Sequence, residues 1–136
     1  MNLTVNHCFL TVHDQDAALA FYTGVLGLEK RNDVSFDGMR WLTVGAPEQA
    51  GLEIGLLLPG APFSPPEDVQ AAIELVAKGL TPGLIFATDD CDAAFEELRG
   101  KGAEVIQEPI DQPYGRDCAF RDPSGNHLRF TQTPKS

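Results

Sequence analysis

The sequence predicts an α+β fold built from two βαβββ modules in a pseudo-twofold arrangement. The first observation behind this prediction is a repeat, because Asp14-Gln15-Asp16-Ala17-Ala18 returns as Asp90-Cys91-Asp92-Ala93-Ala94. The second is that each copy is followed by a helical pattern of apolar residues and then by three strand-like segments. Two such modules predict mixed, curved sheets around a central pocket, with the helices outside.

The first module is expected to span residues 1–58. Its opening strand places His7 and Phe9 on one face, because side chains alternate along a strand. Asp14 is a suitable N-cap for the helix that follows, and Gly27 can take the left-handed conformation that ends it. The strands of this module are expected at residues 3–12, 29–36, 39–44 and 52–58, with Asp37-Gly38 as the hairpin turn between the second and the third.

A linker that contains a helix is expected over residues 59–79. It begins with a proline-rich segment, and residues 67–78 then have a helical composition that ends at a glycine. The second module is expected over residues 80–136, where Asp90 and Gly102 are the predicted cap and stop of the helix. The strands of this module are expected at residues 84–88, 103–107, 116–121 and 127–131.

Two segments between the strands of the second module are expected to be irregular. Residues 108–115 contain two prolines, which cannot donate to a strand ladder, so we expect a loop there. The segment Asp122-Pro123-Ser124-Gly125-Asn126 consists of residues that favour a tight turn. This turn would lead directly into the last strand.

Composition and charge limit the classes of partner. The chain has 136 residues and a hydrophobic fraction of 43%, which are typical of one globular domain. No apolar run approaches the roughly 20 residues of a membrane span, so no membrane contact is expected. The formal net charge of −10 argues against nucleic acid, because a phosphate-binding surface needs clustered Lys and Arg. This acidity could favour a cationic ligand, or it could serve only solubility.

The cysteines indicate the cellular compartment. Cys8, Cys91 and Cys118 are an odd number and have no CxxC spacing, which argues against a disulfide framework or a zinc knuckle. A reducing, cytoplasmic location is therefore expected.

These residues resemble the vicinal-oxygen-chelate superfamily, which includes glyoxalase I, fosfomycin-resistance enzymes, extradiol dioxygenases and bleomycin-binding proteins. The resemblance covers nearly the whole chain and is strongest from Phe21-Tyr22 to Leu26-Gly27-Leu28 and over the turn at residues 122–126. The segment Gln112-Pro113-Tyr114-Gly115-Arg116, together with that turn, is most similar to the bleomycin-binding branch. The resemblance implies the same fold, but the matching residues are not catalytic and leave the activity open.

The resemblance also implies where a metal site would lie. In the metal-dependent members, His and Glu side chains at four positions, on the first and last strand of each module, hold a divalent ion. These positions fall here on His7, Gly55, Gly83 and Arg129. Glycine offers no side-chain ligand and the permanent cation of Arg129 repels a metal, which leaves His7, with Glu53 as a possible addition. We therefore expect no cofactor and no divalent metal.

A ligand pocket is predicted on the inward faces of the strands, formed by His7, Phe9, Trp41, Glu53, Tyr114 and Arg129. On an inward face Arg129 needs a carboxylate partner or an anionic ligand, because an unpaired buried cation is costly. Glu53 is the expected internal partner, and an anion-binding role is the alternative. Trp41 and Tyr114 could stack on a ligand or serve only packing. His7 could line the pocket or act as an acid-base catalyst.

The sequence therefore favours a small-molecule-binding protein of the glyoxalase/bleomycin-resistance type, without the metal site, that holds a small organic molecule. One alternative is a metal-dependent lyase, transferase or dioxygenase of the same superfamily, with His7 and Glu53 as ligands. Another is a metal-free acid-base enzyme that uses His7 and Arg129. The resemblance implies a homodimer, either with side-by-side cavities or with modules paired between chains.

Overall fold

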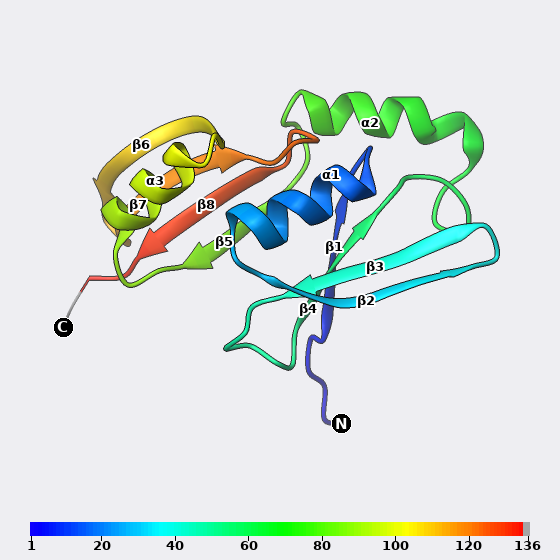
Figure 1. The fold of residues 1–136 in the computed structure, drawn as a ribbon, viewed down its shortest axis with the longest axis horizontal. Helices are drawn as coiled ribbons and strands as arrows, with labels where there is room; N and C mark the ends of the chain where they lie inside the picture. The colour runs from blue at the N-terminus through cyan, green and yellow to red at the C-terminus, as the bar shows by residue number, and fades with distance from the viewer. Residues whose placement is uncertain (135–136) are drawn as a thin grey trace.

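The computed structural model describes residues 1–134, which form two four-stranded sheets joined by a helical connection (Figure 1). The elements in chain order are β1 (His7–Thr11), α1 (Gln15–Ala20), η1 (Phe21–Val25), β2 (Glu29–Phe36), β3 (Met39–Gly45), β4 (Glu53–Leu57), η2 (Pro66–Asp68), α2 (Val69–Ala77), β5 (Leu84–Ala87), α3 (Cys91–Gly100), β6 (Glu104–Gln112), β7 (Gly115–Arg121) and β8 (His127–Gln132). No helix in this part of the chain has the length and apolar content needed to cross a bilayer.

The two sheets have the same topology. Their strand orders are β1-β4-β3-β2 and β5-β8-β7-β6. The strands that come first and last in the sequence of each module, β1 with β4 and β5 with β8, pair in parallel. The remaining neighbours pair antiparallel. The predicted α+β fold of two βαβββ modules is therefore confirmed.

The first module follows the local signals of its sequence. The Asp14 side chain accepts a hydrogen bond from the backbone N–H of Ala17 at 2.9 Å, as an N-cap does. The helix continues as a single π-helical stretch, η1, and Gly27 takes a φ of +76° where the chain leaves it. At the hairpin both Asp37 and Gly38 have positive φ, which is the geometry of a type I′ turn. The opening strand is shorter than predicted and begins at His7.

The predicted loop at residues 108–115 is wrong for most of its length. Strand β6 runs without interruption to Gln112 and includes Pro109. Two register shifts against β7 interrupt the hydrogen-bond ladder on either side of Gln107. Because β6 is an edge strand with these irregularities, the missing N–H of Pro109 costs no paired hydrogen bond.

Helix α2 connects the two sheets and packs against the turn of the second module. In Figure 1 it lies above the first sheet, on the right, and the chain continues from it to β5 of the second sheet, on the left. Gly125 lies so close to this helix that an added Cβ would meet the backbone oxygen of Val76. The last two residues of the predicted second module, 135–136, lie outside the described residues.

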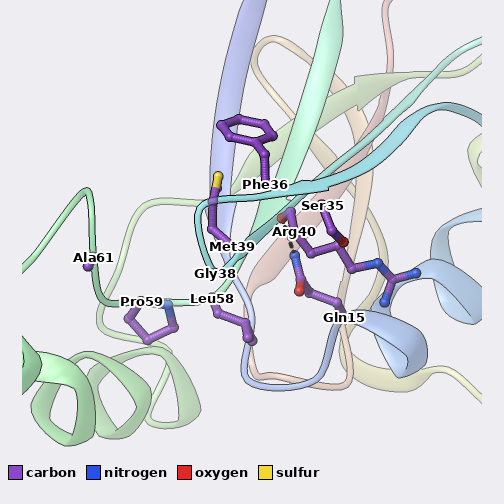
Figure 2. Close-up of a pocket in the computed structure, with 9 residues that line it drawn as sticks. All are labelled: Gln15, Ser35, Phe36, Gly38, Met39, Arg40, Leu58, Pro59 and Ala61. Atoms are coloured by element: carbon purple, nitrogen blue, oxygen red, sulfur yellow. Dashed lines mark hydrogen bonds between the residues drawn. The ribbon is translucent and has the colours of Figure 1, made fainter.

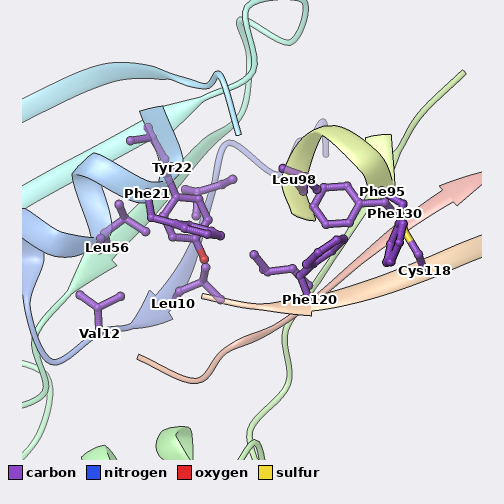
Figure 3. Packing of buried hydrophobic residues seen from close by; sticks show 14 of the residues in the cluster. Leu10, Val12, Phe21, Tyr22, Leu56, Phe95, Leu98, Cys118, Phe120 and Phe130 are labelled. Atoms are coloured by element: carbon purple, nitrogen blue, oxygen red, sulfur yellow. The ribbon is translucent and has the colours of Figure 1, made fainter. Parts of the chain in front are cut away.

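One continuous core joins the modules on the side of the helices (Figure 3). The buried Tyr22 hydroxyl donates to Asp122 Oδ2 at 2.7 Å, and Asn126 Nδ2 donates to the backbone oxygen of Thr11 at 2.9 Å. Burial, together with the neighbouring Asp122 carboxylate, raises the pKa of Tyr22 well above its ordinary value. The turn at residues 122–126 is thereby fastened to the first module.

The opposite face of each sheet, here called its open face, is at the surface of the single chain. Phe9 on the first open face is 52% exposed, and Ile85 on the second is 72% exposed. Within residues 1–134 the expected central pocket is therefore not enclosed between the two sheets. The reason is that the modules dock through their helix-bearing sides and strand ends, which leaves the open faces without a partner.

Candidate functional site

The first open face gathers four of the six predicted pocket residues. In the register of β1 against β4, His7 lies opposite Glu53 and Phe9 opposite Gly55. Trp41 projects from β3 over the same face, with its ring centroid 5.8 Å from that of His7 and 5.7 Å from that of Phe9. The rings of His7 and Phe9 are nearly parallel, at an angle of 12°.

A fourth ring comes from the linker. Phe63 lies 6.5 Å from Phe9, between ring centroids. We call His7, Phe9, Trp41 and Phe63 the aromatic box. Sequence reasoning missed Phe63, because a proline-rich connection has no periodicity that assigns a side chain to a face.

An apolar cavity of about 400 Å³ continues from the aromatic box. Phe9 and Phe63 belong to both, so the two spaces are contiguous. The lining residues are mostly apolar: Phe9, Leu10, Thr11, Leu57, Leu58, Pro59, Phe63, Ser64 and Ala72. Such a lining, with a polar group beside it, is typical of a small-molecule site.

Glu53 places an ionised carboxylate beside the aromatic box. Its Oε1 accepts hydrogen bonds from Thr43 Oγ1 at 2.6 Å and from Asn32 Nδ2 at 2.7 Å, and His7 Nε2 lies 3.7 Å away. The hydrogen bond from Thr43 is the largest cause that lowers the pKa of Glu53, and Asn32 and the nearby His7 lower it further against the effect of burial. The side chain is 23% exposed.

The second open face holds Arg129 in a network of its own. Arg129 Nε donates to Asp117 Oδ2 at 2.9 Å, and one terminal nitrogen donates to Gln107 Oε1 at 2.8 Å. The Tyr114 hydroxyl also donates to Asp117 Oδ2, at 2.8 Å. The expectation that Glu53 is the partner of Arg129 is therefore wrong, because a carboxylate on the adjacent strand lies closer in the same sheet.

Asp117 is a functional-face residue that sequence reasoning missed. It is fully buried, and burial raises its pKa, but the hydrogen bonds from Arg129, Tyr114 and Gln107 together bring the pKa below its ordinary value. The signal was present in the sequence. Cys118 and Phe120 are apolar and lie in the core on the helix side of β7, so alternation along the strand turns Asp117 to the open side.

The six predicted pocket residues are thus divided between two sheets. Among residues 1–134, no hydrogen bond, ion pair or aromatic contact joins His7, Phe9, Trp41 or Glu53 to Tyr114 or Arg129. An acid-base mechanism that uses His7 together with Arg129 has no shared site within one chain.

The donor set does not fit the metal site that the family resemblance implies. An added Cβ at Gly55 would lie 2.5 Å from Phe9 Cδ1, and one at Gly83 would collide with the backbone oxygen of His127. Both glycines therefore have steric reasons to lack a side chain. Within the described part of the chain, no three His, Cys, Asp or Glu residues are grouped so that they could hold a metal ion. His7 and Glu53 supply two donors, fewer than the three protein ligands of a catalytic zinc site.

A larger cavity, of about 680 Å³, lies at the β2–β3 hairpin (Figure 2). Its polar side chains are engaged within the protein. Gln15 Nε2 donates to the backbone oxygens of Arg40 and Leu56, each at 2.9 Å, and the Arg40 guanidinium pairs with Asp33 and Asp16. These groups anchor the hairpin to α1, so we assign the candidate site to the first open face instead.

Several known proteins are similar to this chain. The Bacillus subtilis (strain 168) protein YurT, which is uncharacterised, is 32% identical over 133 residues, or 97% of this chain and 99% of YurT. The crystal structure of UcmS2 superposes with a TM-score of 0.92 at 36% identity, covering 98% of this chain and 100% of that one. TnmS3, an antibiotic binding protein from Streptomyces sp. CB03234, has a TM-score of 0.78 at 29% identity, covering 98% of each chain. A sequence profile also matches residues 4–130, so the chain belongs to the Glyoxalase/Bleomycin resistance protein/Dioxygenase superfamily, as its resemblance predicted.

Proposed function

We propose that the protein binds a small organic molecule on the first open face and holds it without a metal ion. The observation that carries this proposal is the aromatic box, which opens into an apolar cavity and has the carboxylate of Glu53 beside it. Flat apolar walls with one fixed polar group favour a planar ligand, because stacking gives affinity and the polar group gives orientation. The similarity to TnmS3, an antibiotic binding protein, supports binding as the activity.

We further propose that the binding unit is a homodimer in which modules are paired between chains. Exposed apolar side chains on both open faces support this arrangement over one with separate side-by-side cavities, since large apolar surfaces are rarely left in water. In this arrangement the second open face of one chain would cover the first open face of the other. Tyr114 and Arg129 of one copy would then complete the pocket that His7 and Trp41 begin in the other.

Titration of tryptophan fluorescence tests the proposed function directly. Trp41 is the only tryptophan of the chain and belongs to the aromatic box, so its emission reports on that site. We expect saturable quenching by members of a panel of antibiotics and aromatic metabolites, with a matching rise in thermal stability. If no compound changes either signal, the proposal fails.

A matched pair of variants locates the site. Phe9→Ala removes a ring of the aromatic box, and we expect affinity to fall roughly tenfold, or about 1.4 kcal/mol, the size of a lost aromatic contact. Phe36 has the same exposure, 52%, but lines the hairpin cavity, and Phe36→Ala should leave affinity unchanged. The opposite ranking would place the ligand at the hairpin.

A further inference from the structure

One oxygen of Glu53 is available to a ligand. The hydrogen bonds from Thr43 and Asn32 and the close approach of His7 all fall on Oε1. Among the described residues Oε2 accepts no hydrogen bond, yet it is not closed off in the core, since the side chain remains partly exposed. The carboxylate is therefore fixed through one oxygen and presents the other at the open face.

Two arginines that could oppose a bound cation, one in each sheet, are already engaged. Arg31 donates to Glu29 and to the backbone oxygen of Ala46. Arg129 is paired with the buried Asp117 in the other sheet. This pairing removes the reason to expect an anionic ligand, which rested on an unpartnered Arg129.

The rings around Glu53, like its carboxylate, favour a positively charged ligand. Faces of Trp, Phe and Tyr rings carry negative charge density and attract cations, most strongly where water is excluded. Trp41 and Phe9 meet edge to face, at 66°, so the aromatic box has walls in two directions. The formal net charge of −10 adds a long-range attraction for cations.

We propose that the ligand is a planar aromatic molecule that carries a positively charged nitrogen. The ring system stacks in the aromatic box, and the cation lies against Glu53 Oε2. This assignment rests on the proposed function and adds the chemical class of the ligand to it.

Three tricyclic probes of similar shape separate charge from stacking: 9-aminoacridine as the cation, 9-anthracenemethanol as the neutral molecule and 9-anthracenecarboxylate as the anion. Isothermal titration calorimetry at pH 7 should give an affinity for the cation at least tenfold above that for the neutral probe, and weaker binding still for the anion. The comparison uses the unmodified protein, so it does not depend on whether a variant folds.

Glu53→Gln keeps the shape and an acceptor for Thr43 and Asn32 but removes the charge. We expect it to abolish most of the preference for the cation and to leave binding of the neutral probe within a factor of three. Glu48, in the exposed loop after β3, provides the control, because Glu48→Gln changes the net charge equally and should keep the preference.

Each outcome bears on one proposal. Equal or tighter binding of the neutral or anionic probe, or a preference for the cation that survives Glu53→Gln, would overturn the ligand class. The compound panel monitored through Trp41 decides the proposed function separately. If the protein binds neutral compounds of the panel but not 9-aminoacridine, the proposed function stands and the proposal of a cationic ligand is wrong.

Discussion

Glycines at positions 55 and 83 show how single residues determine the chemistry of the two open faces. Both stand where metal-dependent relatives are expected to carry a ligand. At Gly55 the space is taken by the ring of Phe9, and at Gly83 by the backbone of β8. The absence of side chains at these positions is therefore part of the packing of the sheets, and Phe9 occupies the volume that a metal ligand would need.

The two glycines should differ in their tolerance of a methyl group. Gly83→Ala forces a Cβ against the backbone oxygen of His127, which cannot move without breaking the pairing of β5 with β8. Gly55→Ala meets the Phe9 ring, a side chain that can rotate away. We expect urea unfolding to show a loss of about 3 kcal/mol or more for Gly83→Ala and about 1 kcal/mol for Gly55→Ala, following the cost of overpacking.

Ligand affinity should fall more for Gly55→Ala than for Gly83→Ala, which is the reverse of the order expected for stability. Gly55→Ala displaces Phe9 from the aromatic box, so it should weaken binding more than its small effect on stability suggests. Equal losses of stability in the two variants would contradict the close packing at Gly83.

At the scale of elements, the contact between α1–η1 and the turn of the second module holds the two halves together. The hydroxyl of Tyr22 and the carboxylate of Asp122 are both buried, and Asp122 Oδ1 accepts the backbone N–H groups of Ser124, Gly125 and Asn126. One carboxylate thus shapes its own turn and docks it onto the other module.

Removal of the Tyr22 hydroxyl tests this contact. Tyr22→Phe keeps the ring in the core but leaves Asp122 Oδ2 with only the bond from Asn126 Nδ2, and we expect unfolding by urea to show a loss of about 2 kcal/mol, typical of a hydrogen bond to a charged group. Tyr114→Phe is the matched control. It removes a similar bond, to Asp117, from a ring that is half exposed, and it should cost less. A larger loss for Tyr114→Phe would mean that Tyr22 is not central to the docking.

At the scale of the whole molecule, the exposed open faces are the surfaces that the proposed dimer would cover. Ile85 is 72% exposed in the single chain, so Ile85→Asp would change stability little if the protein were a monomer. In the proposed dimer the same change buries a charge at the interface. We expect light scattering after size-exclusion chromatography to report a dimer for the unmodified protein and a monomer for Ile85→Asp, with loss of ligand binding.

Leu80 is the control for this experiment. It is 67% exposed but lies outside both sheets, between α2 and β5, so Leu80→Asp should remain dimeric. A monomeric unmodified protein would refute the paired arrangement.

Local sequence patterns determined the modules. The two capping aspartates, Asp14 and Asp90, and the turn at residues 122–126 act through hydrogen bonds to neighbouring backbone, so their effect can be predicted without the rest of the chain. Alternation along a strand likewise assigned His7 and Phe9 to a common face, because it is a property of the extended backbone. The loop predicted around Pro109 failed because an edge strand tolerates a proline that a central strand does not.

Only the tertiary structure decided which charges pair and which faces are covered. Arg129 pairs with Asp117 rather than with Glu53, because ion pairing depends on the register between strands and on the distance between sheets. Phe63 entered the aromatic box because the linker folds back over β1. The open faces lie at the surface because the modules dock through their helices. This docking depends on contacts between residues far apart in the sequence, which no local pattern encodes.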